Sequence, residues 1–120
     1  MLEGGCFCGA VRYRIDGEVL ESAICHCHSC RKTASAPNLP FVTVDQTAFS
    51  VVRGEPREYR SSPPVTRTFC GTCGSPLAYR HDSEPKTLDV TVVSLDEPEA
   101  TPPTLPPLDQ RKTVVGGDRR

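Results

Sequence analysis

The sequence of 120 residues has little aromatic mass: no tryptophan, three tyrosines, four phenylalanines, and a single methionine. One domain of this length can form a core, but so few large side chains limit what hydrophobic burial contributes to its stability. Bound structural zinc contributes roughly 10 kcal/mol or more of apparent folding free energy. Metal crosslinks would therefore offset the small core.

An excess of charge is also missing, since the formal net charge is -1. Surfaces that bind nucleic acid or anionic membranes need a basic excess, so we expect neither partner. No apolar run approaches the ~20 residues of a membrane span, and residues 1–6 lack the basic and apolar segments of a signal peptide. These absences predict a soluble cytoplasmic protein, whose thiols stay reduced.

What the sequence does contain is cysteine. There are seven, an odd number that a complete disulfide framework cannot accommodate, so metal binding is favoured over disulfides. Three of them lie in the Cys-His-Cys-His-Ser-Cys stretch of residues 25–30. Thiolate sulfur and imidazole nitrogen are ligands that zinc prefers. Cys25, Cys27 and Cys30 are therefore candidate metal ligands.

The other four cysteines form two pairs in glycine-rich turns. Cys6 and Cys8 have glycines on both sides, and glycine tolerates the backbone angles of a tight metal turn. Cys70 and Cys73 lie in a Cys-Gly-Thr-Cys-Gly stretch between two expected strands, so they form a zinc knuckle at a hairpin tip. The knuckle supplies two ligands, and a closed zinc site needs four.

Two pairings complete the knuckle. In the first, Cys6 and Cys8 join it, and the three cysteines of residues 25–30 keep a vacant fourth position, as catalytic zinc usually does. In the second, Cys27 and Cys30 join it as a zinc ribbon, which leaves Cys6, Cys8 and Cys25 without partners. The interval between the two pairs also exceeds the usual ribbon spacing of about 15–20 residues. The first pairing is favoured because it uses all seven cysteines.

Two histidines, His26 and His28, alternate with these ligands in the sequence. Either one as a fourth ligand would close the three-thiolate site and make it purely structural. Because each is adjacent to a ligand cysteine, its side chain is expected to diverge from the metal. Each histidine would then either contact the substrate or be exposed to solvent.

Short β-forming runs between glycine- and proline-rich turns predict an all-β domain without a long helix. Strands are expected at residues 11–15, 39–44, 48–53, 57–60, 65–69, 75–80 and 88–93. A helical turn over residues 31–36, stopped by Pro37, is also expected. Residues 100–120 are proline-rich, polar and without aromatics, which favours an extended or disordered tail after a domain of residues 1–99.

Three motifs occur in order: Gly-Gly-Cys-x-Cys-Gly-Ala-Val-Arg-Tyr at residues 4–13, Cys-His-Cys-x-x-Cys-Arg-Lys at residues 25–32, and Arg-x-Phe-Cys-x-x-Cys-Gly-Ser-Pro-Leu at residues 67–77. Together they make residues 3–99 resemble the glutathione-dependent formaldehyde-activating family, which centromere protein V also resembles. Members of that family usually continue into a further aromatic strand. Residues 100–120 depart from this pattern.

The resemblance implies a β-tent fold of small antiparallel sheets stapled by zinc. It implies a structural zinc on the four cysteines of the first pairing. A second zinc, associated with activity, would be held by the three cysteines of residues 25–30. The implied activity is condensation of glutathione with formaldehyde to S-(hydroxymethyl)glutathione, a carbon–sulfur lyase reaction run in reverse.

A zinc ion on three thiolates suits a sulfur ligand better than it suits hydroxide formation. A thiol entering the vacant position would lose its proton and could attack an aldehyde carbonyl. Arg31 and Lys32, which directly follow Cys30, are candidates for binding the carboxylates of glutathione. The alternative is a non-enzymatic, zinc-stabilised β-tent module that binds a protein or small thiol without turnover.

Overall fold

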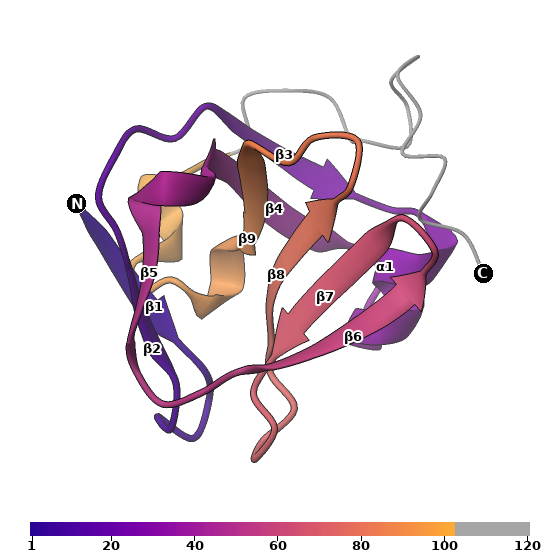
Figure 1. Ribbon diagram of the computed structural model, residues 1–120, viewed down its shortest axis with the longest axis horizontal. Helices are drawn as coiled ribbons and strands as arrows, with labels where there is room; N and C mark the ends of the chain where they lie inside the picture. Colours follow the sequence, from indigo (N-terminus) through magenta and orange to yellow (C-terminus); the bar gives the residue numbers. More distant parts are fainter. Residues whose placement is uncertain (103–120) are drawn as a thin grey trace.

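The computed structural model describes residues 1–102, which form two antiparallel sheets and one short helix (Figure 1). The three-stranded sheet has the order β1-β2-β5, with β1 at Leu2–Gly5, β2 at Arg12–Ile15 and β5 at Phe49–Arg53. The six-stranded sheet has the order β3-β4-β9-β8-β7-β6. Its strands are Glu21–Cys25 (β3), Leu39–Asp45 (β4), Thr87–Thr91 (β9), Pro76–His81 (β8), Val65–Phe69 (β7) and Arg57–Ser62 (β6). The prediction of an all-β fold class is confirmed.

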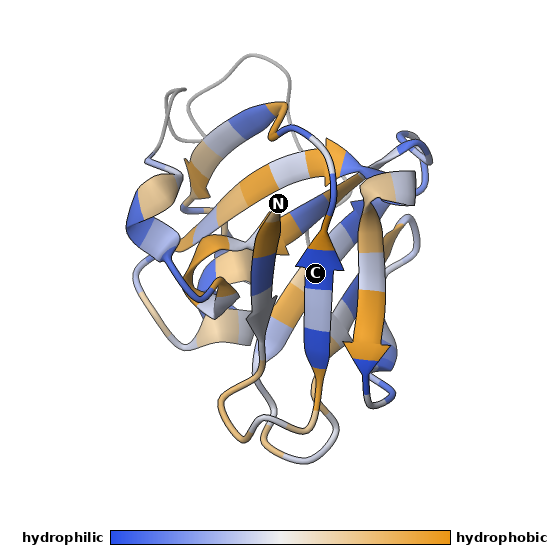
Figure 2. Ribbon diagram, turned by 90° about the vertical axis from the view of Figure 1, so that its left-hand side faces the viewer, coloured by the Kyte–Doolittle hydropathy of each residue, from blue (hydrophilic) through white to orange (hydrophobic). Residues whose placement is uncertain are grey.

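The main core lies between the two sheets. Successive residues of a strand point to opposite faces, and in β2 this buries Tyr13 and Ile15. In Figure 2 the middle strand of the three-stranded sheet, β2, has two blue, hydrophilic bands separated by a paler band and an orange, hydrophobic band at its end. The six-stranded sheet contributes Val42 and its cross-strand partner Val90, both fully buried, each worth about 1.5–3 kcal/mol of transfer free energy.

A second, smaller core lies on the opposite face of the six-stranded sheet. Phe41 belongs to it, and Phe41 precedes Val42 on β4, so the two side chains point to opposite faces. The Phe41 ring packs against the ring of Tyr79, with centroids 5.8 Å apart. Cys25 and Cys30 are buried in the same cluster. The six-stranded sheet therefore separates the main core from a smaller one that contains Cys25 and Cys30.

Helix α1 spans His28–Ala34 and begins earlier than the helical turn predicted for residues 31–36. The Sγ atom of Cys27 caps it by accepting a hydrogen bond from the Cys30 amide at 3.4 Å. Cysteine is not among the usual N-cap residues, so the sequence offered no start signal here. The helix ends at Ala34, and its C-cap residue Ser35 has a left-handed backbone with a φ of 52°, two residues ahead of Pro37. Within residues 1–102, no helix has the length and apolar character needed to span a bilayer.

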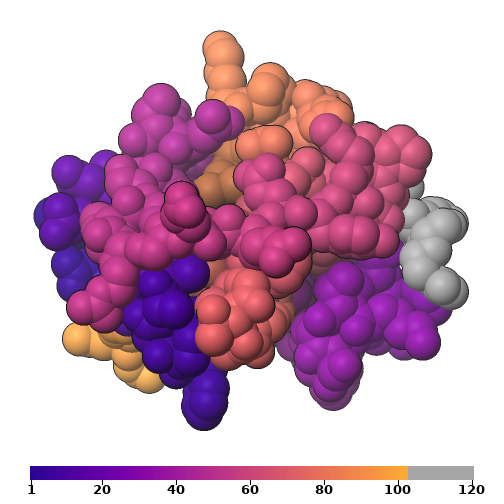
Figure 3. Space-filling model, turned by 60° about the horizontal axis from the view of Figure 1, so that its bottom comes forward, coloured from indigo at the N-terminus to yellow at the C-terminus, as the bar shows by residue number. Residues whose placement is uncertain are grey.

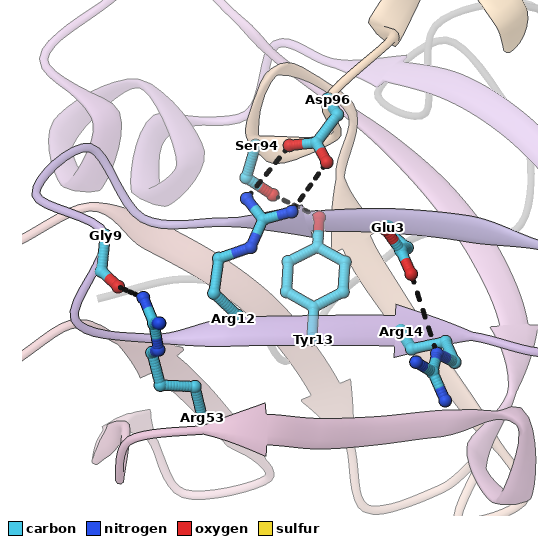
Figure 4. Close-up of polar contacts among 8 residues, drawn as sticks. All are labelled: Glu3, Gly9, Arg12, Tyr13, Arg14, Arg53, Ser94 and Asp96. Atoms are coloured by element: carbon cyan, nitrogen blue, oxygen red, sulfur yellow. Dashed lines mark hydrogen bonds and ion pairs between the residues drawn. The ribbon is translucent and has the colours of Figure 1, made fainter.

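Side-chain hydrogen bonds hold the segment after β9 against the three-stranded sheet (Figure 4). Arg12 makes two parallel hydrogen bonds to the Asp96 carboxylate, at 2.6 and 2.9 Å, and they lower the pKa of Asp96. The hydroxyls of Tyr13 and Ser94 lie 2.6 Å apart, and burial raises the pKa of Tyr13 to about 12. These contacts hold the 3-10 turn η2, Val92–Ser94, and the residue pair that follows it against β2.

Further 3-10 turns are η1, Gln46–Ala48, and η3, Pro98–Ala100. Just after η3, the buried Thr101 accepts a hydrogen bond from the Ser22 hydroxyl through its carbonyl oxygen, at 3.0 Å. Most of the predicted tail, residues 103–120, lies outside the described residues. The domain boundary at residue 99 stays a prediction.

Gly54, which connects β5 to β6, is expected to be intolerant of alanine. Its φ is +78, and a β-carbon there would overlap the backbone carbonyl oxygen of Ala10. Left-handed strain of about 1–2 kcal/mol and an overlap of about 1–3 kcal/mol should together lower the unfolding free energy by roughly 2–4 kcal/mol. Denaturant titration of the metal-loaded Gly54→Ala variant measures this loss.

Gly9 offers the matched control, because its φ is +82 but nothing lies within 4 Å of its would-be β-carbon. Gly9→Ala should therefore show the strain alone, about 1–2 kcal/mol. Equal losses in the two variants would contradict the close approach of Gly54 to Ala10.

Candidate metal centres

Four cysteines from distant parts of the chain meet in one group. Cys6 and Cys8 lie between β1 and β2, and Cys70 and Cys73 lie between β7 and β8. Their sulfur atoms all lie within 4.8 Å of one another. In Figure 3 the two loops that contain them, coloured indigo and salmon, lie side by side. The structure thus brings together the four residues of the first pairing.

The sulfur spacing in this group fits zinc. The Sγ atom of Cys8 lies 3.6 Å from that of Cys6 and 3.8 Å from that of Cys70. Four Zn–S bonds of about 2.3 Å in a tetrahedron place the ligand sulfurs about 3.8 Å apart. A disulfide bond is much shorter, at about 2.05 Å. The spacing therefore fits four ligands of one zinc ion and is too long for a disulfide bond.

Backbone amides point at these sulfurs, because the tight turns expose N–H groups on their inner side. The Val11 amide donates to the Cys6 sulfur at 3.2 Å, and the amides of Thr72 and Cys73 donate to the Cys70 sulfur at 3.4 Å. Hydrogen bonds of this kind favour the thiolate over the thiol. The loops are thus built to stabilise negative sulfur.

The pKa values of two thiols in this group are shifted in opposite directions. The Ser75 hydroxyl, 3.2 Å from the Cys73 sulfur, and the Ser75 amide lower the pKa of Cys73 to about 5. The Ala10 amide favours the Cys8 thiolate, but desolvation and the neighbouring sulfurs outweigh it and raise the pKa of Cys8 to about 11. A thiolate at one cysteine thus disfavours ionisation of its neighbour, and a divalent cation between the sulfurs would allow both to ionise.

The second group forms where a strand meets a helix. Cys25 ends β3, Cys27 caps α1, and Cys30 lies in the first turn of α1. Their sulfur atoms lie within 4.8 Å of one another, with 3.2 Å between those of Cys25 and Cys27. Cys25 and Cys30 are buried and Cys27 is half-buried. The cluster thus offers three ligands, with Cys27 on its outer side.

Among residues 1–102, neither His26 nor His28 joins this group of three. His28 is exposed at the start of α1, and His26 is half-buried between two of the ligands. The knuckle sulfurs belong to the other group, so the zinc-ribbon pairing with Cys27 and Cys30 is not formed. Metal binding by each group stays a prediction.

One residue of this second site, Arg67, was not predicted to take part in it, although it is the first residue of the motif at residues 67–77. Arg67 of β7 is buried, and its Nη2 lies 3.8 Å from the Cys30 sulfur. The signal was its position: it alternates with Val65 and Phe69 on a predicted strand, which places the three side chains on one face. An arginine on an inward-facing strand position has to find polar partners, and here one of them is a cysteine cluster.

A cavity of about 260 Å³ opens beside this site. Thr33 of α1, Phe41 of β4, Arg67 and Phe69 of β7, and Pro76 of β8 are among the residues that line it. Arg67 joins the cavity to the cluster, because it lines the one and contacts a sulfur of the other. A concave, mainly apolar site with a few polar groups is the usual form of a small-molecule pocket.

The basic pair after Cys30 lies elsewhere on the helix. Arg31 and Lys32 are exposed on α1 and are not among the residues that line the cavity. Figure 3 looks onto the salmon knuckle loop, with the purple region that includes α1 beside it. A role for Arg31 and Lys32 in binding substrate carboxylates stays a prediction.

Two thiol clusters, one of four sulfurs and one of three beside a cavity, define a small, cysteine-rich β protein whose sulfur groups could hold metal ions. Residues 1–107 match the family described as glutathione-dependent formaldehyde-activating enzyme, and the chain belongs to this family.

Proteins similar to this chain include two curated relatives. A Schizosaccharomyces pombe protein described as an uncharacterized lyase is 32% identical over 85 residues, which cover 69% of this chain and 61% of that protein. The chain thus spans less than two thirds of this relative. A Halomonas elongata protein, assigned by name to the glutathione-dependent formaldehyde-activating enzymes, is 29% identical over 111 residues, covering 86% of this chain and 71% of that protein.

A solved structure shares the fold. It is the crystal structure of a Rhodobacter sphaeroides protein, 28% identical, with a TM-score of 0.66 over 78% of this chain and 87% of the other.

Proposed function

We propose that the chain is a zinc-dependent enzyme of the carbon–sulfur lyase type, which joins glutathione to formaldehyde or a related small aldehyde. Membership of the family supports these substrates, and the name of the fission yeast relative supports lyase chemistry. The observation that carries the proposal is the group of three sulfurs, Cys25, Cys27 and Cys30, one ligand short of a closed zinc site.

The two clusters have different tasks in this proposal. The four-sulfur group, at the main core, holds a structural ion. Cys25, Cys27 and Cys30 would hold the second ion, which would supply a positive charge that lowers the pKa of a substrate thiol. Cys25 and Cys30 are buried at this site and Cys27 is half-buried, so two ligands lie within the protein and the third lies closer to its surface.

The other contribution of the protein is to bind and position the two substrates. The cavity beside Arg67 holds the thiol and the aldehyde together and out of water. Their reaction then becomes effectively unimolecular. Arg31 and Lys32 supply exposed cations for the two carboxylates of glutathione. A carbon–sulfur bond forms as the carbonyl π bond opens, and the carbonyl oxygen takes up one proton in place of the one lost by the thiol.

Exchange spectroscopy with ¹³C-formaldehyde and glutathione tests this function, because it measures the rate at which free aldehyde and adduct interconvert. The metal-loaded protein is expected to raise that rate above the rate in buffer. The same protein after chelation of the second metal ion should not. A rate equal to that of buffer with both ions bound would contradict the enzyme and favour the metal-stabilised binding module.

A further inference from the structure

Within residues 1–102, Arg67 is the one charged side chain that is buried, with 8% of its surface exposed. A guanidinium remains protonated in proteins, so it cannot escape burial by losing its charge. Its burial is tolerated only where polar or negative groups compensate for the lost water. The identity of those groups therefore indicates what Arg67 is for.

Three contacts hold the guanidinium plane in a fixed position. Nε donates to the hydroxyl oxygen of Ser61 at 3.1 Å, and Nη1 donates to that of Thr33 at 3.3 Å. The guanidinium carbon lies 5.1 Å from the ring centroid of Tyr79, close enough for a cation–π interaction. Strands β6, β7 and β8 and helix α1 all contribute, so the group is rigidly oriented.

A further contact, with the cysteine cluster, indicates what this orientation achieves. Nη2 donates to the Sγ atom of Cys30 at 3.8 Å, within hydrogen-bond reach for sulfur. Cys30 is 1% exposed, so water does not screen this pair effectively. A cation held rigidly against a buried thiolate favours that thiolate and fixes its direction.

We infer that Arg67 is a positioning residue of the three-thiol centre, which holds the Cys30 sulfur and offsets the negative charge of the metal-bound cluster. The inference rests on the proposed function, in that the second cluster binds a metal ion. Three thiolates and one divalent cation carry a net charge of -1, which Arg67 brings to zero in a buried setting. An N–H donor on a ligand sulfur also withdraws electron density from it, which leaves the metal the stronger Lewis acid.

The link to the cavity gives Arg67 a second consequence. Because its side chain lines the cavity and contacts Cys30, the wall nearest the metal centre is positively charged. An incoming thiolate brings one more negative charge to that wall. Loss of the cation should therefore weaken the binding of metal and of thiolate together.

Metal titration of the full chain tests the role, with Zn²⁺ affinity measured against a chromophoric chelator and Co²⁺ as a spectroscopic probe. The variants are Arg67→Gln, Arg67→Lys and the control Arg14→Gln, whose half-exposed side chain pairs with Glu3 on the three-stranded sheet. Arg67→Gln is expected to weaken the second site about 10- to 100-fold and leave the first unchanged. Its sulfur-to-cobalt charge-transfer band should move to lower energy, and Arg67→Lys should lie between it and wild type.

The outcomes separate this inference from the function on which it rests. A wild-type ratio of one metal ion per chain would contradict the proposed function, and the inference with it. Two ions per chain, with the affinity and the cobalt band unchanged in Arg67→Gln, would overturn the inference alone. Equal weakening of both sites in Arg67→Gln and Arg67→Lys would mean that Arg67 only supports the fold, which also overturns it.

Discussion

Replacing Cys73 by serine is expected to unfold the domain. Cys73 is exposed and lies outside the main core cluster, so the change removes almost no packing. It does remove one of four metal ligands, and a structural zinc contributes roughly 10 kcal/mol or more of apparent folding free energy. A typical domain has only about 5–15 kcal/mol of net stability. Far-UV circular dichroism, amide NMR spectra and the metal-to-protein ratio measure the loss.

Thr72→Ala is the matched control for this variant. Thr72 is exposed in the same turn, and the group that it contributes to the site, its backbone amide on the Cys70 sulfur, survives the change. The control is expected to stay folded with two metal ions per chain. If Cys73→Ser gave the same melting temperature and metal content as Thr72→Ala, the four-sulfur group would not be structural.

The strands that the sequence predicted are those in which local preference and tertiary role agree. Residues 65–69 and 75–80 flank the knuckle and pair as β7 and β8. Strand β1, Leu2–Gly5, was not predicted, because glycine has low β-propensity and two of its four residues are glycine. The reason for Gly4 is tertiary: a β-carbon there would overlap the Tyr13 side chain and the backbone of Ser94.

The candidate site also has a part that the sequence predicted and a part that it did not. Cysteine spacing and ligand counting pointed to two groups, since ligands of one turn must lie near each other. The cap made by Cys27 and the start of α1 did not follow from spacing, because a sulfur cap has no common sequence signature. Arg67 lies 37 residues from Cys30, and only the pairing of strands brings the two together. Contacts of that range depend on topology and not on local pattern.

The same exchange at Cys27 is expected to have the opposite effect: the domain stays folded but loses one metal ion and its activity. Cys27 is half-buried and caps α1, and serine is a preferred N-cap residue, so the helix keeps its cap. Compared with wild type that has no ion at the second site, the change in unfolding free energy should stay within about 1 kcal/mol. A neutral hydroxyl is a poor substitute for a thiolate on zinc, so the second site loses its ion.

Metal analysis of Cys27→Ser should give one ion per chain instead of two, and the exchange rate between formaldehyde and its glutathione adduct should fall to that in buffer. His28→Gln is the control, because His28 is exposed one residue further along and lies outside the group of three. It should keep both ions and the activity. If Cys27→Ser lost its fold as Cys73→Ser does, a ligand of the three-sulfur group would be as important for folding as a ligand of the four-sulfur group. If it retained two ions, Cys27 would not be needed to hold the second one. Either result would contradict the different roles assigned to the two clusters.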